Sequence, residues 1–194
     1  IFRYPQDSFP ISTLVLTAIL CAFFIFQASK LYVTNDPLSY FQSDRPLIQD
    51  TKRIHEDLAG IKIFFMSLES KQGKAFQEPK NIQKLVEIQR FLASQGVYDR
   101  SISLADHLKF INHEFRGGTA RQSLPETRQL VAQYLMFMPR GDLDSYVSHD
   151  YRRANIVVRH NITDSHTLNQ YIKELKEVTA QIVGPDMKSF IVGE

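Results

Sequence analysis

The chain has 194 residues, of which 23 are basic and 21 acidic, and the basic residues are scattered, so nucleic acid is not an expected partner. The only cysteine is Cys21, which excludes a disulfide-stapled scaffold. Six histidines occur without the H-E-x-x-H spacing of a metal site, and we expect no metal or other cofactor.

The first feature along the chain is an uncharged, apolar stretch over residues 8–29. As a helix rising about 1.5 Å per residue it would reach roughly 33 Å, enough to cross a hydrocarbon core of about 30 Å. We therefore expect residues 1–31 to hold a transmembrane helix and its flanks. A cleaved signal peptide is the alternative, but Asp7, Pro5 and Pro10 stand where a basic cluster would be typical.

Residues 32–60 are expected to connect this helix to the following domain. Turn residues and aromatic residues alternate up to Pro46, which is typical of an extended connector. Apolar residues then recur at helical spacing from Ile48 to Leu58, and Gly60 is a stop signal. The pattern predicts a short helix in this region.

A strand, a helix and a second strand are predicted next. The aromatic-rich run 61–69 is typical of a buried strand. After a loop through Gly73, Pro79 is a plausible first-turn residue of a helix that runs to about Gln95, with Gly96 as a left-handed cap. Residues 97–102 form the second predicted strand.

A helical insert is predicted over about 103–139. Ser103 followed by Asp106 is a capping-box-like start for a helix that ends near Gly117. Ser123 followed by Glu126 repeats this signal and predicts the start of a second helix there.

The last part of the chain repeats the order of strand, helix and strand. Residues 152–160 alternate as in a strand, and a helix capped by Asp164 or Ser165 carries an apolar stripe from Leu168 to Ile182. Gly184 ends that helix, and residues 190–192 supply a short strand. The fold class is therefore α/β (α+β), with a ferredoxin-like split β-α-β domain over residues 61–194.

No catalytic constellation is visible. The run from His149 to Arg153 contains the side chains used in acid–base catalysis, but polar residues that enter a strand normally form hydrogen bonds and ion pairs holding it, and we interpret them so. The loops 70–73 and 116–118 have too few glycines to cradle a phosphate, and Glu69 and Glu87 are isolated carboxylates. We predict no enzyme and assign no catalytic, cofactor-binding or metal-binding residue.

Several segments together resemble predicted exporters of the resistance-nodulation-division (RND) superfamily, in its MMPL-like branch. The resemblance covers about residue 11 to Glu194, and it depends on the order and spacing of five individually weak motifs. These are Asn35–Phe41 after the apolar stretch, Gly73-x-Ala75-Phe76 before Pro79, Ser101–Asp106, Leu130–Leu135, and Asp150–Ala154 before a strand.

The resemblance implies a fold and a function. In that family each half of the transporter begins with a membrane helix, followed by a large extracytoplasmic loop of ferredoxin-like lobes and five more helices. This chain is similar to the first helix and the loop of one half, and the Asn35–Phe41 connector is more like that of the second half. The proton-relay carboxylates of the family lie on later helices, so no functional residue carries over.

The implied role is that of a porter domain in a proton-driven exporter, which guides a lipid or other hydrophobic substrate out of the membrane. The intact protein would be a multi-pass protein of the inner (plasma) membrane, with this domain on the periplasmic side. Its partners would be the lipid bilayer, the remaining transmembrane helices, the second half of the transporter and the substrate.

Two alternatives stay open. One span cannot translocate a substrate by alternating access, so the chain is either part of a longer transporter or a stand-alone relative. The alternative function is a membrane-tethered module for ligand binding, sensing or assembly, with no transport activity.

Overall fold

The computed structural model describes residues 11–30, 45–46, 48–50, 53, 60, 62–118 and 122–193. The predicted connector and short helix within residues 32–60 lie almost wholly outside this part of the chain. The elements in chain order are α1 (Ile11–Ala28), β1 (Lys62–Ser70), η2 (Ala75–Gln77), α3 (Pro79–Gln95), β2 (Tyr98–Ser103), α4 (Leu104–Phe115), α5 (Arg128–Phe137), α6 (Arg140–Leu143), β3 (Arg153–His160), α7 (Ser165–Val183) and β4 (Met187–Val192).

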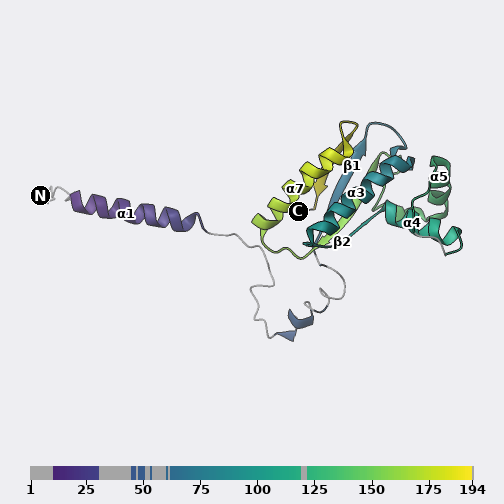
Figure 1. Ribbon diagram of the computed structural model, residues 1–194. Helices are drawn as coiled ribbons and strands as arrows, with labels where there is room; N and C mark the ends of the chain where they lie inside the picture. Colours follow the sequence, from purple (N-terminus) through teal and green to yellow (C-terminus); the bar gives the residue numbers. More distant parts are fainter. Residues whose placement is uncertain are drawn as a thin grey trace, which may run out of the picture.

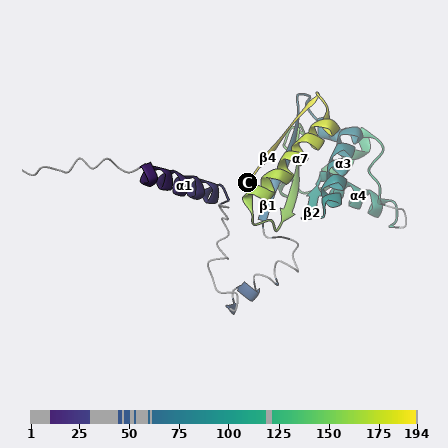
Figure 2. The same cartoon turned by 60° about the vertical axis from the view of Figure 1, so that its left-hand side comes forward.

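Four strands form one sheet in the order β2-β3-β1-β4, and every neighbouring pair is antiparallel. Strands β1 and β2, which α3 connects, are therefore parallel to each other with β3 between them. Strands β3 and β4, which α7 connects, have β1 between them in the same way. Helices α3 and α7 lie side by side on one face of the sheet (Figures 1 and 2). The mixed α/β class and the two β-α-β-like units predicted from the sequence are confirmed.

The core lies between this face and the two helices. Alternate residues of β1 point inward, and Phe64, Met66 and Leu68 are almost fully buried. Their partners on β3 in the antiparallel register are Val158, Ile156 and Ala154, in that order, so apolar side chains meet across the two central strands. The helices contribute a second set of buried residues, namely Ile82, Leu85, Ile88, Leu92, Ile172, Leu175 and Val183.

Local signals set several helix ends as predicted. Pro79 is the first residue of α3, and Gly96 ends this helix with a φ of 65°. At the start of α4, the Ser103 hydroxyl accepts a hydrogen bond from the N–H of Ala105 at 3.1 Å. The Asp106 carboxylate accepts the N–H of Ser103 at 2.8 Å, which completes the predicted capping box.

Two predicted details of the helices are wrong, namely the cap of α5 and the end of the helical insert. Thr127, not Ser123, caps α5, because its hydroxyl accepts the N–H of Leu130 at 3.2 Å, whereas the Ser123 carbonyl and hydroxyl accept hydrogen bonds from Asn112. The short α6 extends the helical insert to Leu143. In α7 the predicted stripe does face the core, since Ile172 and Leu175 are buried and Tyr171 and Ile182 pack against it half-buried; Thr179 and Val183 add to this buried face.

Helix α1 presents its apolar side chains to solvent. The large ones between Ile11 and Phe26 are 47% to 80% exposed. Among the described residues, no helix is both long enough and apolar enough to span a membrane. The predicted transmembrane helix over residues 8–29 is therefore not supported: α1 has 18 residues, and residues 8–10 lie outside the described part of the chain.

Candidate functional site

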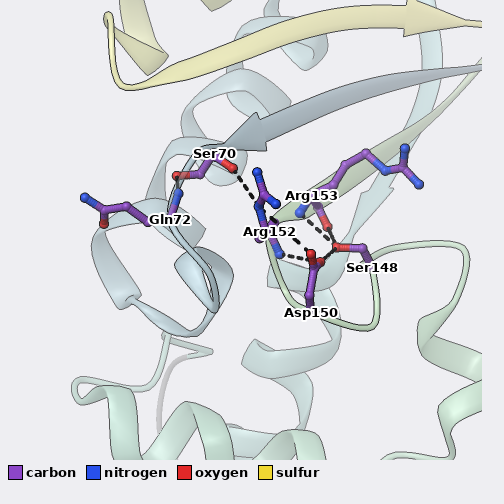
Figure 3. A network of polar contacts seen from close by, with 6 residues as sticks. All are labelled: Ser70, Gln72, Ser148, Asp150, Arg152 and Arg153. Carbon is purple, nitrogen blue, oxygen red and sulfur yellow. Dashed lines mark hydrogen bonds and ion pairs between the residues drawn. The ribbon is translucent and has the colours of Figure 1, made fainter.

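The polar run before β3 forms a tight turn organised by one carboxylate (Figure 3). Asp150 Oδ1 accepts the Ser148 hydroxyl at 2.6 Å and the backbone N–H of Arg152 at 3.1 Å. The Ser148 hydroxyl oxygen in turn accepts the N–H of Arg153 at 2.9 Å. The hydrogen bond from Ser148, then that from the Arg152 backbone, lower the pKa of Asp150 below its ordinary value.

This turn is bound to the loop that follows β1. The backbone N–H groups of Ser70, Lys74 and Phe76 donate to the carbonyls of Arg152, Asp150 and Tyr151. In the opposite direction, Arg152 Nε donates to the Ser70 carbonyl at 3.3 Å. The guanidinium lies 3.9 Å from Asp150, and this ion pair is largely open to water. Within the run His149–Arg153, residues 150–153 hold the start of β3 against the β1 loop, in agreement with the structural interpretation of this run. None of these hydrogen bonds involves His149.

Two adjacent cavities lie beside Ser70. The first, about 280 Å³, lies among Ser70, Lys71, Gln72, Lys80, Asn81, Lys84, Pro185, Asp186 and Met187. The second, about 250 Å³, shares five of these residues and adds Glu69, Arg152 and Lys188. The two cavities therefore have a common wall where β1 ends and β4 begins. We call them together the basic groove.

The groove is much more basic than the chain as a whole. Lys71, Lys80, Lys84, Arg152 and Lys188 line it, against only the two carboxylates Glu69 and Asp186. The whole chain has 23 basic and 21 acidic residues. The positive charge is thus concentrated at the meeting point of the β1 loop, the first turns of α3 and the α7–β4 connection.

The partners of these side chains leave hydrogen-bond donors available. Lys84 Nζ donates to the Val183 carbonyl at 2.8 Å, at the C-terminal end of α7. Within the described part of the chain, Lys71, Lys80 and Lys188 form no ion pair within 4.0 Å. The arrangement can therefore attract an anion, because several basic residues line one small volume.

Two other titratable side chains among the described residues, those of His160 and His107, pack against aromatic rings. His160 is 3% exposed, its Nδ1 accepts the N–H of Ile162, and its ring contacts Phe64. Burial lowers the pKa of His160, and the charge of Lys62 lowers it further, while Asp99 acts in the opposite sense. His107 lies against Tyr146. No group of three His, Cys, Asp or Glu residues in the described ranges is placed to hold a metal.

The sequence did not predict the basic groove. Its lysines come from two distant parts of the chain, residues 71–84 and Lys188, and each part by itself is a common solvated pattern. The loop 70–73 has too few glycines to cradle a phosphate with its backbone. The positive charge of the groove comes from side chains. A comparison with protein-family models finds no match, and a comparison with curated proteins finds none either.

Proposed function

We propose that the chain is part of a proton-driven RND-type exporter. Residues 61–194 would be an extracytoplasmic, ferredoxin-like porter domain that guides a lipid or other hydrophobic substrate out of the inner membrane. Helix α1 with its flanking residues would be the first membrane helix, and the rest of the transporter would supply proton coupling. The partners are then the bilayer, the remaining helices and the second half of the transporter.

The arrangement of the sheet carries this proposal. The strand order β2-β3-β1-β4 with two helical crossovers is that of a split β-α-β domain, which the resemblance implies. Three of the five motifs behind the resemblance lie at junctions of this domain. Gly73–Phe76 precedes α3, Ser101–Asp106 joins β2 to α4 through the capping box, and Asp150–Ala154 is the turn that enters β3.

Exposed apolar surface supports the proposed partners. Helix α1 has large apolar side chains open to solvent, and burying apolar surface is favourable by about 25 cal/mol per Å². The sheet face opposite the core carries Phe65, Val157 and Phe190, which are only partly buried. Lipid around α1 and a neighbouring lobe against this face would cover both surfaces.

The membrane part of the proposal can be tested with Cys21, the only cysteine of the chain, which is exposed on α1. We expect a water-soluble maleimide to label Cys21 in denaturant but not after reconstitution into lipid vesicles. The matched control is Met136→Cys in a Cys21→Ser background, because Met136 is 84% exposed and lies on α5. Equal labelling rates of the two cysteines in vesicles would contradict the proposal.

The alternative is a membrane-tethered ligand-binding, sensor or assembly module, which the presence of the basic groove favours. The coding sequence that follows Glu194 separates the two functions. Several further apolar spans would support the exporter, whereas a stop codon or a signalling domain would support the tethered module.

A further inference from the structure

We propose that the basic groove binds the phosphate group of an anionic ligand, with Ser70, Lys71, Lys80 and Lys84 as its main contacts. Phosphate binding by the groove is independent of whether the chain belongs to an exporter.

Basic residues outnumber acidic residues in the lining of the groove. Three lysines and one carboxylate, Asp186, line the first cavity, and the second adds Arg152 and Lys188 against one further carboxylate, Glu69. In a concave site the field of several like charges adds up and raises the local concentration of counter-ions. An anion in the groove would reduce the mutual repulsion of these ammonium groups.

Two hydrogen-bond donors that line the groove, the Ser70 hydroxyl and the Lys84 ammonium, have protons left for a ligand. Ser70 is 5% exposed, and its hydroxyl oxygen accepts the N–H of Gln72 at 3.1 Å. Among the described residues no acceptor takes its hydroxyl proton. Lys84 Nζ uses one of its three protons on the Val183 carbonyl, so two remain. A buried hydroxyl and a half-buried ammonium in the lining of the groove therefore have protons left to donate to a ligand.

The number of donors favours phosphate over carboxylate. Phosphate presents three or four acceptor oxygens in different directions, whereas a carboxylate presents two in one plane. The donors of the groove come from the end of β1, the β1 loop and the first turns of α3, so they approach from several sides. A cavity of about 280 Å³ also has room for a small polar group attached to the phosphate.

The test uses the full chain in micelles of an uncharged detergent. Sodium phosphate is titrated at constant ionic strength, and the amide signals of the chain are followed by NMR. We expect saturable shifts at Lys71, Gln72 and Asp186, which are not reproduced by chloride.

The variant that tests the contacts is Lys71→Gln/Lys80→Gln, which removes two exposed lysines of the groove and leaves the Lys84 contact with α7 intact. We expect at least a tenfold loss of affinity. The control Lys109→Gln/Lys173→Gln removes the same charge outside the groove and should change affinity by less than about twofold.

Two further probes distinguish the sources of the phosphate. Glycerol 3-phosphate represents a soluble phosphomonoester, and a short-chain phosphatidate in the same micelles represents a lipid headgroup, with phosphatidylcholine as its control. The probe that binds more tightly identifies the source of the phosphate group. The proposal is overturned if phosphate gives no saturable shift at tens of millimolar, or if the groove variant binds it as well as the unmodified chain.

Discussion

Replacing Ser103 with alanine should destabilise the domain more than an ordinary capping substitution. Ser103 is fully buried, caps α4, and also donates to Oε1 of Gln89 on α3 at 3.0 Å. Loss of a helix cap costs about 0.5–2 kcal/mol, and loss of a further hydrogen bond about 0.5–1.5 kcal/mol. We expect a decrease of about 2 kcal/mol in the free energy of unfolding, measured by urea denaturation with circular dichroism in an uncharged detergent.

The matched control is Ser123→Ala, since the sequence predicts the same capping role at both serines. Ser123 is exposed and caps no helix, and its carbonyl would still accept the hydrogen bond from Asn112. We expect a loss of less than about 0.5 kcal/mol. A Ser103→Ala variant that loses no more stability than Ser123→Ala, with an unchanged urea dependence, would refute the assigned role of the buried cap.

Three other predictions concern the core, the turn before β3 and pH. Leu175→Ala should lower the free energy of unfolding by about 2–5 kcal/mol in the same assay, because Leu175 is fully buried on α7. Arg152→Gln should lower the melting temperature more than Arg153→Gln, because only Arg152 donates to the Ser70 carbonyl; equal or reversed shifts would contradict this. Because the pKa of His160 is lowered in the folded chain, the unfolded chain takes up this proton at a higher pH than the folded chain does. The contribution of His160 to the free energy of unfolding should therefore be fully present above about pH 6.5 and be lost as the pH falls below that value. His160→Gln should flatten that part of the pH profile, and an unchanged slope would exclude His160 as its source.

The sequence by itself determined most element boundaries in the α/β domain, because these depend on local backbone chemistry. Pro79 and Gly96 enclose α3, and Ser103 with Asp106 starts α4, as their positions along the chain predict. The alternation of β3 likewise placed Ala154, Ile156 and Val158 on one face, and all three are buried. The local signal at Ser123 was wrong: Thr127 caps α5, and Ser123 instead accepts hydrogen bonds from Asn112.

The tertiary structure alone decided which side chains of α7 are buried most deeply and where the basic groove lies. An apolar stripe of a helix has several possible orientations, and packing against α3 and the sheet selects one. The groove requires side chains from distant segments: Lys84 and the carbonyl of Val183 are 99 positions apart, yet they form one hydrogen bond. A local sequence pattern cannot predict this contact between distant segments. The contact forms only after the two crossovers have placed the end of β1, the start of α3 and the start of β4 side by side.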